Sequence, residues 1–186
     1  MGKGSAVMSE PMTPPDPASY NPLVDPEALL VSAMMWSNDE ETLQEIAEFL
    51  TPEDFYRVQY SVVFSAICSQ ISNSRPHDPA SIRVELRAGG DDVGIPLSTV
   101  NSLITELTTI GANDLAVRAY ADQVASESYR RQFGSMVEAL RFAADTAPES
   151  QLFEIMIAHG KKQRRAWERY QSFSQRHSSS PDSPNS

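Results

Sequence analysis

The sequence predicts an all-α protein, in which a small helical bundle is followed by a long antiparallel helical hairpin. Apolar residues recur at steps of three and four along most of the chain, and no segment alternates apolar and polar residues for long enough to predict a strand. Between Leu97 and Ser180 the only proline is Pro148, so long helices are allowed on both sides of it.

The two ends of the chain are predicted to be disordered. Five of the thirteen prolines fall at or before Pro22, among Ser, Thr and Met. Such a composition buries too little apolar surface to offset the entropy lost on ordering the chain. We expect a disordered arm over residues 1–21 and a disordered tail over 177–186. The bundle is predicted over 22–112, and the hairpin with its basic C-terminal end over 113–176.

The first helices are marked by capping residues. Asp25 is an N-cap ahead of a proline, which predicts a helix from Pro26 to about Trp36. A second helix with an apolar face ends at the segment Thr51–Asp54. There a capping threonine, a proline and two acidic residues form the start signal of a short helical turn.

Three more helices complete the predicted bundle. A stripe of apolar residues at helical spacing predicts a helix over about 59–71 that faces a core. Asp78-Pro79 starts the next helix, and Gly89-Gly90 ends it. The last runs from Ser98 to near Gly111.

The hairpin follows from two long helices and the short connection between them. Asn113 is a good N-cap for a helix that runs to about Ala144, and Pro148 starts a second helix that extends to about Phe173. Because residues 145–147 leave so little chain between them, the second helix must fold back along the first.

The second helix of the hairpin carries an imperfect coiled-coil seam. The residues at alternating steps of three and four are Phe153, Met156, Gly160, Gln163, Trp167, Tyr170 and Ser174. A hairpin that stands off a small bundle exposes apolar surface, which favours association with a second copy or another protein. The candidate surface is Phe133, Met136, Val137, Leu140, Phe153, Met156, Ile157, Trp167 and Tyr170. The alternative is that these residues only hold the two helices together.

The charge is uneven along the chain. The net charge is −10, which argues against a general nucleic-acid-binding protein. The C-terminal residues 161–186, however, carry six basic and two acidic residues. Cations among aromatic rings suit single-stranded nucleic acid, so a weak contact with single-stranded DNA is the alternative function. Its candidate residues are Lys161, Lys162, Arg164, Arg165, Arg169 and Arg176, with Trp167, Tyr170 and Phe173.

The sequence shows no catalytic or metal-binding pattern. Three histidines and the single cysteine, Cys68, are scattered without ligand spacing, and no Gly-Lys dipeptide lies in a phosphate-binding loop. We expect neither an enzyme nor a bound metal or cofactor. No apolar stretch is long enough to cross a bilayer, so we expect a soluble cytoplasmic protein that does not bind membranes.

Several motifs occur in the order and spacing of a known family. They are Pro26-Glu27-Ala28, Leu50-Thr51-Pro52-Glu53-Asp54-Phe55-Tyr56, Val62-Val63-Phe64-Ser65-Ala66-Ile67, Pro76-His77-Asp78, Ala112-Asn113, Val117-Arg118-Ala119-Tyr120-Ala121 and Arg130-Arg131. Over about Asn21 to Ile157 the chain resembles the N-terminal domain of DnaB-type replicative helicases. Two departures are Ser32, where the family usually has glycine, and Gly94-Ile95-Pro96-Leu97, which replaces a Gly-Gly turn.

The resemblance implies a non-catalytic scaffold. In this family the hairpins pair between subunits to form the collar of a hexameric ring, which receives primase and, in some systems, loader or regulator proteins. No RecA-type ATPase follows in the sequence, so the resemblance carries over neither unwinding nor ATP hydrolysis. We expect a stand-alone replication accessory protein that dimerises through its hairpins, binds replicative helicase or primase, or does both. A third possibility, after the accessory protein and the single-stranded nucleic-acid-binding alternative, is a decayed or truncated helicase gene with no selected role.

Overall fold

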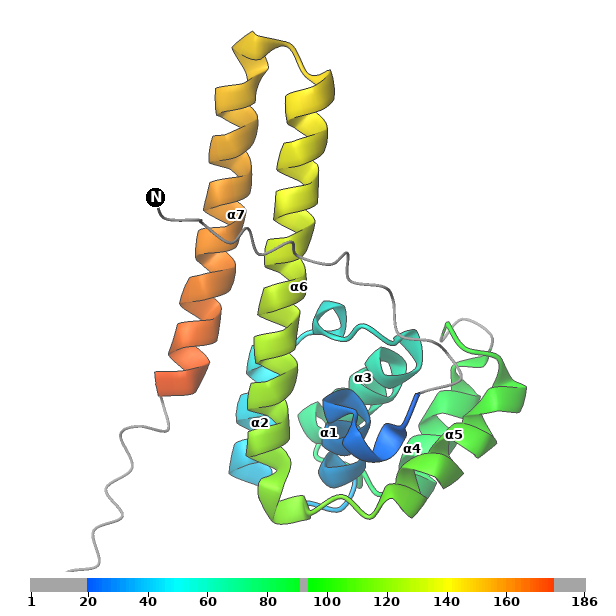
Figure 1. The fold of residues 1–186 in the computed structure, drawn as a ribbon. Helices are drawn as coiled ribbons and strands as arrows, with labels where there is room; N and C mark the ends of the chain where they lie inside the picture. The colour runs from blue at the N-terminus through cyan, green and yellow to red at the C-terminus, as the bar shows by residue number, and fades with distance from the viewer. Residues whose placement is uncertain (1–19, 91–93, 176–186) are drawn as a thin grey trace, which may run out of the picture.

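The computed structural model describes residues 20–90 and 94–175, and every regular element in this part of the chain is helical (Figure 1). The all-α fold class is therefore confirmed. In chain order the elements are η2 (Pro22–Val24), α1 (Pro26–Met34), α2 (Glu40–Phe49), η3 (Pro52–Asp54), α3 (Val58–Ser72), α4 (Pro79–Ala88), α5 (Leu97–Ile110), η5 (Asp114–Ala116), α6 (Val117–Thr146) and α7 (Glu149–Gln175). The segments expected to be disordered lie outside the described residues, apart from Tyr20 and Asn21.

The helix starts follow the capping residues. The side chain of Asp25 accepts a hydrogen bond from the N–H of Glu27 at 2.8 Å, and Asp78 caps α4 in the same way. Asn113 caps the short turn η5 rather than α6 itself, so the long helix begins at Val117, three residues later than its cap predicted. Gly111 ends α5 with φ of 63°, the left-handed conformation that favours glycine.

The core of the bundle forms around α1, which packs against α3, α5 and α6 (Figure 1). The fully buried large side chains of this core include Leu30, Met34, Leu43, Ile46, Tyr60, Phe64, Ile67, Ile82, Leu86 and Leu107. Ser32 is also fully buried, and its hydroxyl donates to the carbonyl of Leu107 at 2.7 Å. A serine thus ties α1 to α5 at the position where the DnaB-type domains usually carry glycine.

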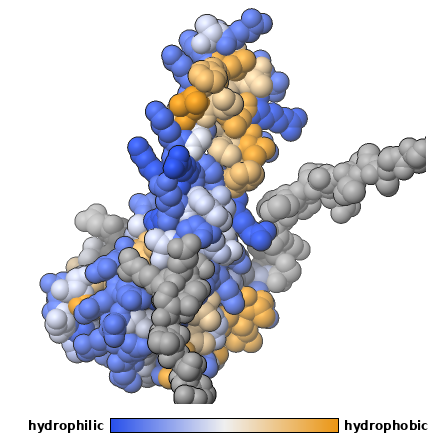
Figure 2. All heavy atoms as spheres, turned by 90° about the vertical axis from the view of Figure 1, so that its left-hand side faces the viewer, coloured by the Kyte–Doolittle hydropathy of each residue, from blue (hydrophilic) through white to orange (hydrophobic). Residues whose placement is uncertain are grey.

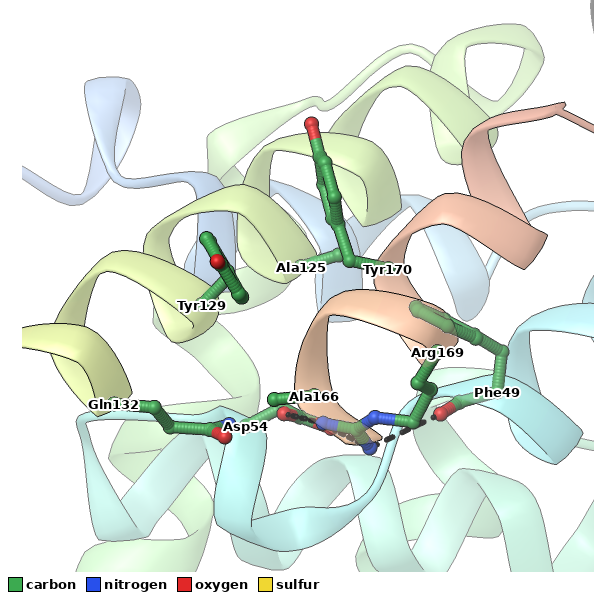
Figure 3. Close-up of a pocket in the computed structure, with 8 residues that line it drawn as sticks. All are labelled: Phe49, Asp54, Ala125, Tyr129, Gln132, Ala166, Arg169 and Tyr170. Atoms are coloured by element: carbon green, nitrogen blue, oxygen red, sulfur yellow. Dashed lines mark hydrogen bonds and ion pairs between the residues drawn. The ribbon is translucent and has the colours of Figure 1, made fainter. Parts of the chain in front are cut away.

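The hairpin of α6 and α7 is held to the bundle by a buried carboxylate, Asp54, whose side chain is 1% exposed. The guanidinium of Arg169 on α7 donates to both carboxylate oxygens, at 2.6 and 2.9 Å (Figure 3). Ser128 on α6 donates to Oδ1 at 2.6 Å, and the Thr51 N–H donates to Oδ2 at 2.9 Å. One side chain of η3 therefore receives hydrogen bonds from both helices of the hairpin.

This site leaves little free space. The hollow that Figure 3 shows between α2, α6 and α7 has a volume of only about 10 Å³, enough for about one water molecule. Burial alone would raise the pKa of the Asp54 carboxyl, but the hydrogen bonds from Arg169, Ser128 and Thr51 together hold that pKa below its ordinary value. Asp54 is therefore an ionised structural group rather than a ligand site.

The C-terminal end of α7 makes a second attachment to the bundle. The ring of Phe173 stacks on Phe49 of α2, with centroids 3.9 Å apart. On its other side, the guanidinium of Arg118 on α6 lies over the Phe173 ring, 4.1 Å from the centroid, and also pairs with Glu45. The lower parts of α6 and α7 are thus fixed to α2, and the other end of the hairpin extends beyond the bundle (Figure 1).

We predict that Asp54→Asn lowers the free energy of unfolding by about 2–4 kcal/mol, because it leaves the Arg169 guanidinium without its buried counter-charge. Urea denaturation followed by circular dichroism measures this. The matched control is Glu168→Gln, which removes the exposed partner of Arg164 and should change stability by less than about 0.5 kcal/mol. Equal effects of the two variants would contradict the role given to Asp54.

The same carboxyl predicts a pH dependence. Because its pKa is lower in the folded than in the unfolded protein, its contribution is complete above about pH 5 and is lost progressively as the pH falls through the lowered pKa. The stability difference between wild type and Asp54→Asn should therefore shrink on acidification. A stability difference that stays constant, or grows, as the pH falls from 6 to 3 would contradict a lowered pKa for Asp54.

Candidate interaction surface on the hairpin

The free end of the hairpin carries exposed apolar side chains. Among the nine residues predicted for this surface, six are exposed: Phe133, Val137, Phe153, Met156, Ile157 and Trp167. The most exposed of these is Phe153, at 67%. Figure 2 shows the resulting hydrophobic area on the upper part of the hairpin. Met136, Leu140 and Tyr170 are half-buried.

Towards the tip, the less exposed face of α7 lies beside the predicted seam, whereas the seam residues Gln163 and Tyr170 nearer the bundle are themselves half-buried. Leu152, Ile155, His159 and Ala166 are less exposed than their neighbours and recur at steps of three, four and seven, as a buried stripe does. On α6, which packs against α7, Ala143 near the tip is buried. Phe153, Met156 and Ile157 are displaced by one residue from this stripe and lie on the outer flank. These three residues are exposed and do not pack between the two helices of the hairpin.

We call the five exposed residues Phe133, Val137, Phe153, Met156 and Ile157 the hairpin patch. The two on α6 are four residues apart, and on α7 Met156 and Ile157 follow Phe153 by three and four residues, so each set shares one helix face. The antiparallel pairing places Val137 near the height of Ile157 and Phe133 closer to the bundle, because the α6 segment around Phe133 and the α7 segment around Lys162 line one groove. The patch is therefore shared by both helices.

Below the patch, aromatic rings hold the two helices together. Tyr129 on α6 lies 5.6 Å from Trp167 and 5.7 Å from Tyr170, measured between ring centroids. Two residues of the predicted association surface, Trp167 and Tyr170, therefore contact Tyr129 within the chain. Trp167 contributes to the cluster and still exposes 44% of its surface.

The cations of α7 divide into two groups. Arg169 is committed to Asp54, and Arg164 pairs with Glu168 at 2.9 Å. The exposed cations Lys161, Lys162 and Arg165 form no ion pair within residues 20–90 and 94–175. Arg176 lies outside the described residues.

Two of the three rings that were candidates for stacking on bases are used inside the protein. Phe173 is 3% exposed, and Tyr170 lies in the cluster with Tyr129. Of these rings the structure therefore brings only Trp167 to the surface, together with the exposed cations Lys161, Lys162 and Arg165.

Sequence reasoning missed the polar contacts that position the hairpin. Glu27 is buried at the start of α1, where its carboxylate accepts from the N–H groups of Tyr56 and Arg57 at 2.6 and 3.0 Å and lies 3.5 Å from the guanidinium of Arg131 on α6. Burial raises the pKa of the Glu27 carboxyl above its ordinary value, although these donors oppose the shift. The sequence analysis used Glu27 only as part of the motif Pro26-Glu27-Ala28 at a helix start, and this motif did not predict the contact with Arg131.

An open groove separates the hairpin from the bundle. It has a volume of about 1190 Å³ and is lined by Tyr56 of the bundle, by Arg130 and Phe133 of α6 and by His159 and Lys162 of α7, among others. Among the described residues, no group of three or more His, Cys, Asp or Glu is arranged to hold a metal ion. No helix in that part of the chain has the length and apolar character needed to span a bilayer.

The fold and this surface define a helical bundle with a protruding hairpin, and the comparisons give its family. The model of the DnaB-like helicase N terminal domain matches residues 20–126, a little over half of the chain. The chain therefore belongs to this family. A comparison with curated protein sequences finds no match.

A solved structure shares the fold. It is the N-terminal domain of DnaB helicase from Mycobacterium tuberculosis, with a TM-score of 0.59 and 19% sequence identity, covering 75% of this chain and 96% of that chain. The family match ends within α6, before the first residue of the hairpin patch. The function of the patch must therefore be argued from its own geometry.

A matched pair of phenylalanines tests how the hairpin divides into packed and free surface. Phe173→Ala should lower the free energy of unfolding by about 3–4 kcal/mol, because it removes a buried ring from between Phe49 and Arg118. Phe153→Ala, on the hairpin patch, should change it by less than about 0.5 kcal/mol in dilute solution. Urea denaturation measures both. A large loss for Phe153→Ala would show that the patch is covered within the chain.

Proposed function

We propose that this protein is a non-catalytic accessory module of DNA replication, which self-associates through its hairpin and binds replicative helicase or primase to regulate loading or priming. The observation that carries the proposal is the hairpin patch, an apolar surface on a protruding element that no other described part of the chain covers. Membership of the DnaB N-terminal domain family supports the part of the proposal that places the protein in DNA replication.

Physical chemistry favours association at this patch. Exposed apolar side chains are normally scattered singly on a soluble protein, whereas here several recur along both helices of the hairpin. Fully burying one such side chain contributes about 1.5–3 kcal/mol, so a contact that covers several supplies the free energy of a stable complex. The rigid attachment of the hairpin through Asp54 presents the patch without a large ordering cost.

Self-association is tested by light scattering across a range of protein concentrations. The wild type should show a dimer, and the double variant Phe153→Ser and Met156→Ser should weaken it about tenfold or more, because both side chains lie in the hairpin patch. The matched control is Val84→Ser, which removes an equally exposed apolar side chain from α4 of the bundle and should leave the dimer unchanged.

Partner binding is tested by co-elution of the purified protein with the replicative helicase and with the primase of the same cell. The wild type should co-elute with at least one of them, and the Phe153→Ser and Met156→Ser variant should not. A wild-type protein that stays monomeric at all concentrations and also binds neither partner would contradict the proposed function.

A further inference from the structure

The groove between the hairpin and the bundle, which we call the hairpin–bundle groove, is a second candidate binding surface. Its bundle wall is the segment around η3, with Glu53, Phe55 and Tyr56, and its other walls are the middle parts of α6 and α7. Its volume of about 1190 Å³ exceeds the roughly 300–1,000 Å³ of a typical small-molecule site. The size therefore suits a segment of polypeptide better than a small ligand.

Two cations of the groove have no charged partner in the described part of the chain. Arg130 on α6 and Lys162 on α7 are exposed, and neither forms an ion pair within residues 20–90 and 94–175. A third cation, Arg131, is already used, because it lies 3.5 Å from the carboxylate of Glu27 and donates to the carbonyl of Asp54. Among the described residues that line the groove, Glu53 is the one acid. The groove thus carries an excess of positive charge in a chain whose net charge is −10.

Exposed rings and an unpaired amide line the same groove. Tyr56 is 64% exposed and Phe133 is 47% exposed, and both contribute to its walls. The side chain of Gln163 also lines it, and the Nε2 of this amide is buried without an acceptor among the described residues. A buried donor without an acceptor is unfavourable, so the groove favours an occupant that brings carbonyl or carboxylate oxygens.

We propose that the hairpin–bundle groove binds a short acidic segment of a partner protein, with carboxylates facing Arg130 and Lys162 and an apolar side chain lying against Tyr56 and Phe133. Complementary charge selects the acidic segment, and the exposed rings give it apolar surface to cover. This inference goes beyond the proposed function, because it requires neither a second copy of the chain nor the α7 residues of the hairpin patch.

An acidic peptide fits the groove better than single-stranded nucleic acid does. Every nucleotide brings a phosphate, and nucleic-acid sites usually neutralise many of them with rows of cations. Here only two cations of the groove are unpaired among the described residues, and the net charge of −10 opposes a polyanion. A peptide needs to carry only as many carboxylates as the groove has cations, and its backbone supplies the oxygens that suit Gln163.

The bundle wall of the groove is held in place before anything binds. The N–H of Tyr56 donates to the carboxylate of Glu27 at 2.6 Å, and Arg131 on α6 lies beside the same carboxylate. The contact of Arg131 with the carbonyl of Asp54 joins this wall to the hairpin a second time. Little ordering of the protein is therefore needed when the occupant binds.

Fluorescence anisotropy tests the inference with a fluorescein-labelled octapeptide that contains three aspartates and two leucines. The wild type should bind it saturably at low salt, and Arg130→Gln with Lys162→Gln should weaken binding about tenfold, because two charge contacts are lost. The matched control is Arg83→Gln with Arg87→Gln, which removes two exposed cations from α4 and should leave binding unchanged. Equal losses in the two double variants would show a response to net charge alone and would overturn the inference.

The apolar half of the site has its own readout. Tyr56→Ala should weaken binding of the octapeptide several-fold, because it removes an exposed ring from the groove. The same octapeptide with serine in place of each leucine should bind the wild type more weakly by a similar factor. Circular dichroism checks that all the variants fold.

A labelled oligothymidylate decides between the two classes of occupant. If it binds more tightly than the octapeptide, and Arg130→Gln with Lys162→Gln removes that binding, the occupant is nucleic acid and the inference is overturned. A wild-type protein that does not bind the octapeptide at all overturns it as well.

The outcome is distinguishable from that of the proposed function. The Phe153→Ser and Met156→Ser variant leaves the walls of the groove intact and should bind the octapeptide as the wild type does. Failure of peptide binding removes the acidic occupant but leaves self-association and co-elution to stand on their own tests. A protein that binds the octapeptide but forms no dimer supports this inference and removes the proposed self-association.

Discussion

The arrangement of this protein depends on one buried carboxylate. Asp54 sits on a single turn between α2 and α3, and it receives hydrogen bonds from Ser128 on α6 and Arg169 on α7. A charge removed from water at such a place is costly unless donors surround it, so its ionised form requires both helices to be in position. The bundle therefore fixes the direction in which the hairpin leaves it.

Fixing one end of the hairpin leaves the other end free. Near the bundle, the rings of Phe49 and Phe173 and the cation of Arg118 fill the space between α2, α6 and α7. Towards the tip, among the described residues, the two helices have only each other to pack against, and each can bury only one face in that contact. The apolar residues on the outer flank are therefore exposed by geometry, and a second chain is what would remove them from water.

The fold class, the order of the helices and the hairpin were all predictable from the sequence, because caps, prolines and apolar spacing are local signals. Asp25 and Asp78 were identified as caps and act as caps. The family model and the solved DnaB structure support the same fold. The attachment of the hairpin to Asp54 was not predictable. An acidic side chain in the first turn of a helix indicates only a favourable interaction with the helix dipole. Its partners lie 74 and 115 residues away in the chain, at distances over which local pattern carries no information.

The candidate surface was predicted as a set of residues but not as a face. A heptad pattern cannot decide between two neighbouring stripes of one helix when both are apolar, and α7 presents Leu152 and Ile155 to α6 while Phe153 and Met156 point elsewhere. The difference of one residue changes which side chains need a partner. It also explains why Arg169, counted among the cations for nucleic acid, is instead part of the attachment to Asp54.

Amide hydrogen exchange at two protein concentrations tests the central claim most directly. If the hairpin patch is an association surface, the amides around Phe133 to Ile157 will exchange more slowly at high than at low protein concentration, while those of α1 and α3 in the bundle stay unchanged. Exchange along the hairpin that is the same at both concentrations, in a range where light scattering reports a dimer, would show that association uses another surface.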